Sequence, residues 1–215
     1  MIPVKPHLAA LVAGHEPCAA RYARSLANAD AYWAAEAAML TWFAPWRSVR
    51  GGAGPGTTWF EGGKLNACYD CVDRHPADRV AILWAKNEPG EVERITYGEL
   101  RDRVCRIANV LRASGVKKGD RVCIYLPMVP ELPITMLACA RIGAVHSVVF
   151  AGFSARALRD RIVDAGARVL VTADEGLRGP KAIPLKAIAD EAAQGVIDTL
   201  LVVRRTGASV GWTPG

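Results

Sequence analysis

Residues 120–150 read DRVCIYLPMVPELPITMLACARIGAVHSVVF, and this stretch decides the fold. Asp120–Leu126 and Val145–Phe150 are short, almost continuously apolar runs, which is typical of strands with both faces covered. Between them, Glu131–Ile142 has the length and composition of a helix. A strand, a helix and a second strand in this order predict a right-handed parallel crossover unit.

The same alternation continues on both sides of this unit. Downstream we expect a helix capped by Ser154, a strand over 168–172, a helix over 185–193 and a strand over 198–204. Upstream we expect a hairpin of 80–85 with 91–95, followed by a helix that opens on the capping box Thr96–Glu99 and stops at Gly115. The sequence therefore predicts an α/β protein with part of a doubly wound, mostly parallel sheet.

The first 58 residues differ in character and are expected to form a helical N-terminal extension. Apolar residues recur near helical spacing after Asp30, which we take as the N-cap of a helix. The Gly/Pro-rich stretch Gly51–Gly56 is interpreted as a flexible linker. Residues 59–215 are then the first portion of the α/β domain, and the lack of an element signal after Gly207 predicts that this domain is truncated at its C-terminal end.

Composition and charge exclude several classes of function. The net charge of +6 invites a nucleic-acid hypothesis, but the arginines alternate with acids, as in Glu99–Arg103, which is typical of a solvated face. No run approaches the ~18 apolar residues of a membrane span, and no signal peptide is evident. We therefore expect a cytoplasmic protein with neither a nucleic-acid nor a membrane partner.

Six cysteines raise the questions of zinc and redox chemistry. Cys68 and Cys71 form a single CxxC, and His75 would add only a third ligand, so no metal site is predicted. Three other cysteines, Cys105, Cys123 and Cys139, lie in apolar surroundings and are expected to be small buried hydrophobes. A redox role for the CxxC pair is the alternative to a structural one.

Two loops that follow predicted strands have features that suit an anion. Phe150–Ser154 combines small residues with the start of a helix, whose free amides favour phosphate. Arg178 and Lys181 flank a Gly-Pro pair after the 168–172 strand, and together they form a compact positive feature. The alternatives are an ordinary strand-to-helix turn for the first loop and a solvated turn for the second.

An ordered series of motifs resembles the acetyl-CoA synthetase family, which forms AMP and belongs to the adenylate-forming enzymes. The series runs in register from about residue 30 to 205. It comprises WFEGGKLN at 59–66, CVDRH at 71–75, ITYGEL at 95–100, GDRV at 119–122, YLPM at 125–128, ACARIGAVH at 138–146 and FAGFS at 150–154.

The resemblance implies a two-step ligase. Acetate and ATP give an acyl-adenylate and pyrophosphate with the help of Mg²⁺, and CoA then displaces AMP. The implied CoA-binding residues are Phe150, Ala151, Gly152, Phe153, Arg178, Gly179, Pro180 and Lys181. Lys181 stands where many relatives have Arg, and Pro180 stiffens a loop that is often Ala-Gly.

The family's ATP loop, acyl pocket and C-terminal domain are expected downstream of this chain, so no residue here is assigned a catalytic or metal-binding role. We expect the segment alone to be inactive. A preference for propionate and a non-catalytic CoA- or nucleotide-binding module are the alternatives. The oligomeric state is not readable from the sequence.

Overall fold

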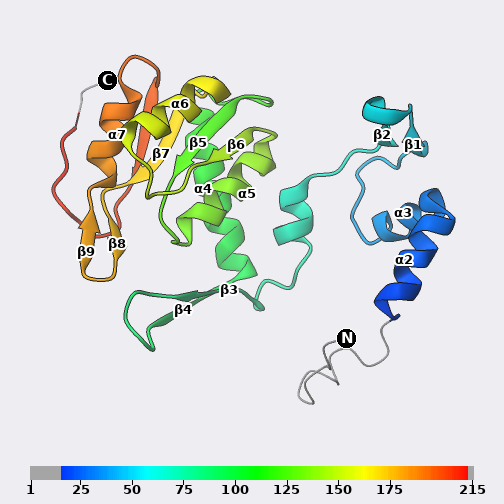
Figure 1. Cartoon of the computed structure of the whole chain (residues 1–215). Coiled ribbons are helices and arrows are strands. Elements are labelled where there is room, and N and C mark those ends of the chain that lie inside the picture. The colour runs from blue at the N-terminus through cyan, green and yellow to red at the C-terminus, as the bar shows by residue number, and fades with distance from the viewer. Residues whose placement is uncertain (1–15, 213–215) are drawn as a thin grey trace. The chain divides into compact units, whose positions relative to one another are not determined.

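The structure is a computed structural model that describes residues 16–212. The chain divides into two compact units, Met1–Leu65 and Asn66–Gly215, which are described separately below. Figure 1 shows the chain coloured by residue number.

The first unit contains two helices and a small hairpin. The helices are α2 (Cys18–Ala27) and α3 (Ala29–Ala37), and the hairpin pairs β1 (Ser48–Gly51) with β2 (Thr58–Glu61). The predicted cap of α3 was wrong by two residues. Asn28, rather than Asp30, is the N-cap and accepts a hydrogen bond from the Ala31 amide at 3.0 Å. Asp30 lies in the first turn instead, where a carboxylate is favourable to the helix dipole.

The stretch Gly51–Gly56 differs from the linker that its composition predicts. Gly51 is the last residue of β1, and Gly52–Gly56 belong to the connection to β2, where Gly54–Gly56 forms a 3₁₀ turn. Rings of Trp42, Trp46 and Phe60 pack with centroids 4.8–5.5 Å apart beside this hairpin. Aromatic packing of this kind stabilises a short hairpin that would be marginal alone.

The second unit begins with a π-helical turn, η2 (Tyr69–Asp73), and the antiparallel hairpin of β3 (Val80–Ala85) and β4 (Val92–Thr96). Helix α4 (Tyr97–Ala113) follows directly. The predicted capping box is present, because Thr96 Oγ1 accepts from the Glu99 amide and Glu99 accepts from the Thr96 amide at 2.8 Å. This reciprocal pair fixes the start of α4.

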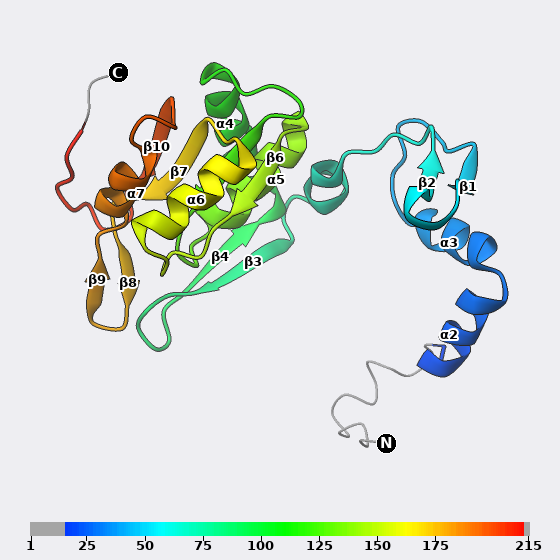
Figure 2. The same ribbon diagram turned by 45° about the horizontal axis from the view of Figure 1, so that its top comes forward.

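A four-stranded parallel sheet forms the centre of the second unit. Its strands are β5 (Arg121–Tyr125), β6 (Val145–Val148), β7 (Val169–Ala173) and β10 (Thr199–Val203), in the order β10–β7–β5–β6. The covering helices are α5 (Glu131–Ile142), α6 (Ala155–Ala165) and α7 (Leu185–Ala193), together with α4. Helices α4 and α5 lie together on one face, and α6 and α7 on the other (Figures 1 and 2).

Both faces of β5 and β7 are therefore buried, as their apolar sequences predict. Residues 122–125 and 169–173 are buried throughout, and they form one core with the inward sides of the helices. The predicted fold class, α/β with a doubly wound parallel sheet, is confirmed. Helices α5 and α7 and strand β3 have the predicted bounds. Strands β4 and β7 have the predicted length but are shifted by one residue, and β5, β6 and β10 are each two residues shorter than predicted.

One hairpin was not predicted. Within the segment expected to be a plain loop, β8 (Gly176–Arg178) pairs with β9 (Lys181–Ile183). The hairpin leaves the carboxyl end of β7 and returns to the start of α7 (Figure 1). Over the described residues 16–212, no helix combines the length and apolar character that crossing a membrane requires.

Candidate functional site

The topology of the sheet indicates where a ligand would bind. From β5 the chain moves to β6 on one side, and then passes back over β5 to β7 on the other side. In open α/β sheets, ligands occupy the crevice beyond the carboxyl ends of the strands where this reversal occurs. Here that edge carries the β5–α5 loop, the β6–α6 turn and the β8–β9 hairpin.

The turn Phe150–Phe153 is fixed to the sheet by a buried tyrosine. Tyr125, the last residue of β5, is fully buried, and its hydroxyl donates to the Phe153 carbonyl oxygen at 2.8 Å. The turn is closed by the Phe153 amide, which donates to the Phe150 carbonyl oxygen at 3.1 Å. Burial raises the pKa of Tyr125, so its hydroxyl keeps the proton that it donates.

Gly152 leaves room for the Phe150 ring to lie against this turn. A Cβ atom at Gly152 would lie 2.4 Å from Cε1 of Phe150, well inside van der Waals contact. Ser154 follows as the N-cap of α6 and accepts from the Ala157 amide at 3.3 Å. The small residues and the cap therefore place the first free amides of α6 directly beside the turn.

Two phenylalanine rings stand exposed on this turn. Phe150 is 66% exposed and Phe153 is 37% exposed, and their centroids lie 5.9 Å apart in an edge-to-face arrangement. The guanidinium of Arg161 lies 4.5 Å from the centroid of Phe153. An exposed aromatic pair beside a cation and a helix N-terminus can hold a flat ring and a phosphate together.

The second predicted segment, Arg178–Lys181, forms the tip of the β8–β9 hairpin. Arg178 and Lys181 are directly paired across the hairpin, and Gly179 adopts a left-handed φ of +57° in the turn between them. Directly opposite residues of an antiparallel pair share one face of the ribbon, so like charges there destabilise it. A bound anion would relieve this repulsion.

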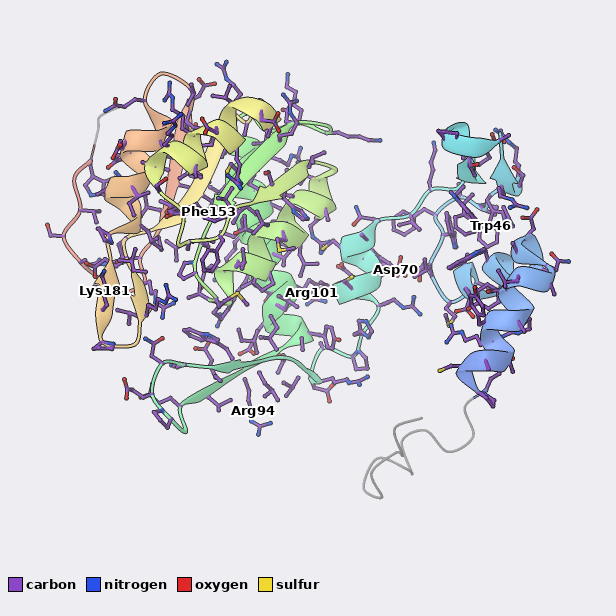
Figure 3. All side chains as sticks on the ribbon, in the orientation of Figure 1. Trp46, Asp70, Arg94, Arg101, Phe153 and Lys181 are labelled. Atoms are coloured by element: carbon purple, nitrogen blue, oxygen red, sulfur yellow. The ribbon has the colours of Figure 1, made fainter. Side chains whose placement is uncertain are left out.

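The positive charge of this tip is not neutralised within the described part of the chain. Both side chains are exposed, and no described carboxylate lies within 4 Å of either one. Figure 3 shows Lys181 at the hairpin and Phe153 at the turn beside α6. The two segments follow strands on opposite sides of β5, so β5 and its Tyr125 lie between them.

The root of the hairpin is held by a buried carboxylate. Asp174 is only 2% exposed, and its oxygens accept hydrogen bonds from the backbone amides of Glu175, Arg205, Thr206 and Gly207 at 2.8–3.1 Å. Burial alone would raise the pKa of Asp174, but these four amides lower it below the ordinary value of 3.8. Asp174 therefore stays ionised and joins the end of β7 to the segment that follows β10.

Close packing also sets the direction of the hairpin. Gly176 lies against the side chains of Leu185 and Pro127, where a Cβ would approach Cδ1 of Leu185 to 3.1 Å. Pro127 belongs to the β5–α5 loop, whose Met128 carbonyl oxygen accepts from Trp84 Nε1 at 3.1 Å. The three loops at this edge are thus tied to neighbouring elements.

The burial of Cys68, Cys123 and Cys139 agrees with the structural interpretation, whereas Cys105, also expected to be buried, is only partly so. Burial raises the pKa of Cys68 and of Cys123 to about 11 and that of Cys139 to about 12, so these thiols are not nucleophilic at neutral pH. Cys71 is exposed and remains a free thiol. Within residues 16–212, no group of three His, Cys, Asp or Glu side chains is arranged to hold a metal ion.

Comparison with known proteins gives the family. The model of the AMP-binding enzymes matches residues 68–213, which is most of the chain. This chain belongs to the AMP-binding enzyme family. A second model, described as the acetyl-coenzyme A synthetase N-terminus, matches residues 18–71. The two matches meet close to the boundary between the two compact units.

Several curated members of this family are closely similar in sequence. The acetyl-coenzyme A synthetase of Saccharophagus degradans is 55% identical over 203 residues, covering 89% of this chain and 31% of that protein. Acetyl-coenzyme A synthetase 2 of Pseudomonas putida is 51% identical, covering 90% of this chain and 31% of that protein. The chain therefore spans about a third of the length of these relatives.

A solved structure supports the same conclusion. The acetoacetyl-CoA synthetase from Streptomyces lividans superposes with a TM-score of 0.83 at 28% identity, covering 95% of this chain and 34% of that chain. The resemblance to the acetyl-CoA synthetase family that the sequence motifs indicate is thereby confirmed at the level of the family.

Proposed function

We propose that this chain is the front part of an acetate–CoA ligase that forms AMP. In the proposed reaction, acetate attacks the α-phosphate of ATP, which gives acetyl-adenylate and releases pyrophosphate. The thiol of CoA then attacks the acyl carbon and AMP leaves. Relatives named acetyl-coenzyme A synthetase, 49–55% identical over about nine tenths of this chain, support this proposal.

The role proposed for this segment is to hold the nucleotide part of CoA. The observation that carries it is the pair Arg178 and Lys181, two exposed cations opposite one another at a hairpin tip with no described carboxylate within 4 Å. The planar guanidinium of Arg178 can bind a phosphate with two hydrogen bonds, whereas the ammonium of Lys181 acts as a point charge. Pro180 and Gly179 fix the turn that presents them.

The turn Phe150–Phe153 would complete the site. Its exposed rings can pack against the adenine of CoA, while Ala151 and Gly152 let the ligand approach the backbone. Tyr125 and Asp174 are not proposed to contact CoA. Tyr125 fixes the turn, and Asp174 fixes the root of the hairpin. We assign no catalytic residue and no Mg²⁺ ligand in this chain, and the metal would enter with ATP on other parts of the enzyme.

The experiment is a chimera in which residues 1–215 replace the matching residues of the Saccharophagus degradans relative. The chimera is expected to form acetyl-CoA from acetate, ATP and CoA, with the parent enzyme as control. The acyl pocket of the chimera comes from the relative, so the chimera should keep the parent's ratio of propionate to acetate rates. The melting temperature of the chimera is compared with that of the parent. A chimera that is as stable as the parent yet performs neither adenylation nor thioester formation would contradict the proposal and favour a non-catalytic module.

A further inference from the structure

A second cationic feature lies at the amino ends of the strands, whereas the candidate CoA site lies at their carboxyl ends. A surface cavity of about 490 Å³ opens between the end of α4, the loop that leads into β5, and the end of α5. Arg112, Lys117, Lys118 and Arg141 line it, and no acidic residue does. A volume of this size is in the range of small-molecule sites.

Three of these four cations have no acidic partner in the part of the chain that the structure describes. Arg141 is neutralised by Asp73, whose two oxygens accept from its guanidinium at 2.7 and 3.1 Å. In contrast, no carboxylate of residues 16–212 lies within 4 Å of Arg112, Lys117 or Lys118. The cavity therefore carries about three uncompensated positive charges.

The loop that bears the two lysines is held in place by its own backbone. The Asp120 carboxylate accepts from the Lys117 amide at 2.7 Å, which closes the loop. The Gly119 amide donates to the Gly143 carbonyl oxygen at 2.9 Å, which joins the loop to the end of α5. The stem of Lys118 packs over Gly143, where a Cβ would lie 3.0 Å from its Cγ. Preorganised cations lose less entropy when a ligand binds.

We propose that this cavity binds a small, multiply charged anion of the phosphate class. The planar guanidinium of Arg112 would donate two hydrogen bonds to the anion, and the ammonium groups of Lys117 and Lys118 would act as point charges. Asn109 and the partly buried Cys105 also line the cavity. The site is separate from the CoA site, because it lies at the amino ends of β5 and β6.

Cys105 provides a local readout of binding. The full chain is alkylated with neutral iodoacetamide at low protein concentration, and each cysteine is followed by peptide mass spectrometry. Inorganic pyrophosphate is the probe, and sodium chloride at matched ionic strength is the reference. Pyrophosphate should slow the alkylation of Cys105 several-fold and leave exposed Cys71 unchanged. Melting temperature is measured in parallel and should rise with pyrophosphate.

The variants decide between a site and a general salt effect. The double variant Lys117→Gln/Lys118→Gln should lose both the protection of Cys105 and the rise in melting temperature. The control is Arg106→Gln, an exposed arginine of α4 that does not line the cavity, and it should behave as the parent does. Melting temperature reports binding even if native Cys105 does not react. Both readouts are taken in chains that also carry Arg178→Ala, so that pyrophosphate bound at the hairpin tip does not contribute.

Two results would overturn the proposal. One is a parent chain that shows no pyrophosphate response in either readout. The other is a double variant that is less stable but shows an unchanged pyrophosphate response, which would mean that these cations only offset the dipoles at the ends of α4 and α5.

Discussion

Replacing Asp174 with Asn should loosen the segment that follows β10 without unfolding the sheet. In the native protein, one oxygen of Asp174 accepts from the amides of Glu175 and Arg205 at 2.8 and 2.9 Å, and the other accepts from Thr206 and Gly207 at 3.1 and 2.8 Å. An asparagine keeps one acceptor and turns an NH₂ group toward the other pair of amides.

The size of the effect follows from the bonds lost. Hydrogen bonds to a charged group contribute roughly 1.5–3 kcal/mol each, and losing two while keeping some compensation should cost about 2–3 kcal/mol. Since 1.4 kcal/mol is a factor of ten, the amides of residues 205–207 should exchange with solvent about 30 to 150 times faster. Amide hydrogen exchange resolved to these residues is the assay.

The matched control is Asp198→Asn at the other end of β10. Asp198 is 58% exposed and pairs with Arg168, which is 72% exposed, so losing this ion pair should cost less than about 1 kcal/mol. If the amides of 205–207 exchange at the same rate in both variants and in the parent, the Asp174 carboxylate does not stabilise the hairpin root and the argument is refuted.

The pH dependence gives an independent check with a definite sign. The pKa of Asp174 is lower in the folded protein than its ordinary value, so its stabilisation is complete above that ordinary value and is lost as pH falls through the folded pKa. After correction for intrinsic exchange, protection of the same amides should hold at neutral pH and decline only below about pH 4. Asp174→Asn should remove this decline.

Three further predictions concern the chain as a whole. Residues 1–215 alone should form no AMP or pyrophosphate from acetate and ATP, because the ATP loop and acyl pocket expected for the family lie beyond them; turnover above a heat-treated blank would contradict this. The isolated chain should self-associate through the unpaired edge of β6, where Val145 and Val148 are 52% and 45% exposed, so a single monomeric sedimentation boundary at high concentration would oppose it. Labelling with a disulfide reagent at pH 8 should modify exposed Cys18 and Cys71 first and leave Cys68, with its pKa near 11, unreacted until unfolding; ready formation of a Cys68–Cys71 bond would restore the redox alternative.

Periodic elements could be predicted from the sequence because local chemistry determines them. The capping box at Thr96–Glu99 and the bounds of α5 and α7 are encoded within a few residues, and the continuous apolar runs of β5 and β7 follow from burial on both faces. The positions of the two candidate loops could be predicted for the same reason, since each directly follows a strand in an alternating α/β pattern.

What the sequence did not reveal depends on tertiary contacts. The β8–β9 hairpin has strands of only three residues, too short for an alternation signal, although Gly-Pro between Arg178 and Lys181 is a turn signal that could have suggested it. Gly51–Gly56 has a linker composition, yet the aromatic cluster around Trp42 favours a hairpin. Nothing local to Tyr125 shows that its hydroxyl reaches Phe153, which is 28 residues away.

The central claim, that the β8–β9 hairpin holds the phosphates of CoA, is tested most directly by kinetics of Arg178→Ala in the active chimera. One charge-assisted hydrogen bond contributes roughly 1.5–3 kcal/mol, so KM for CoA should rise about 10- to 100-fold. Lys181→Ala should cost less, because an exposed ammonium is screened by salt. In the proposed reaction adenylation precedes CoA binding, so acetate-dependent ATP–pyrophosphate exchange should be unchanged in both variants. An unchanged KM for CoA, or exchange that falls as far as thioester formation, would contradict the claim.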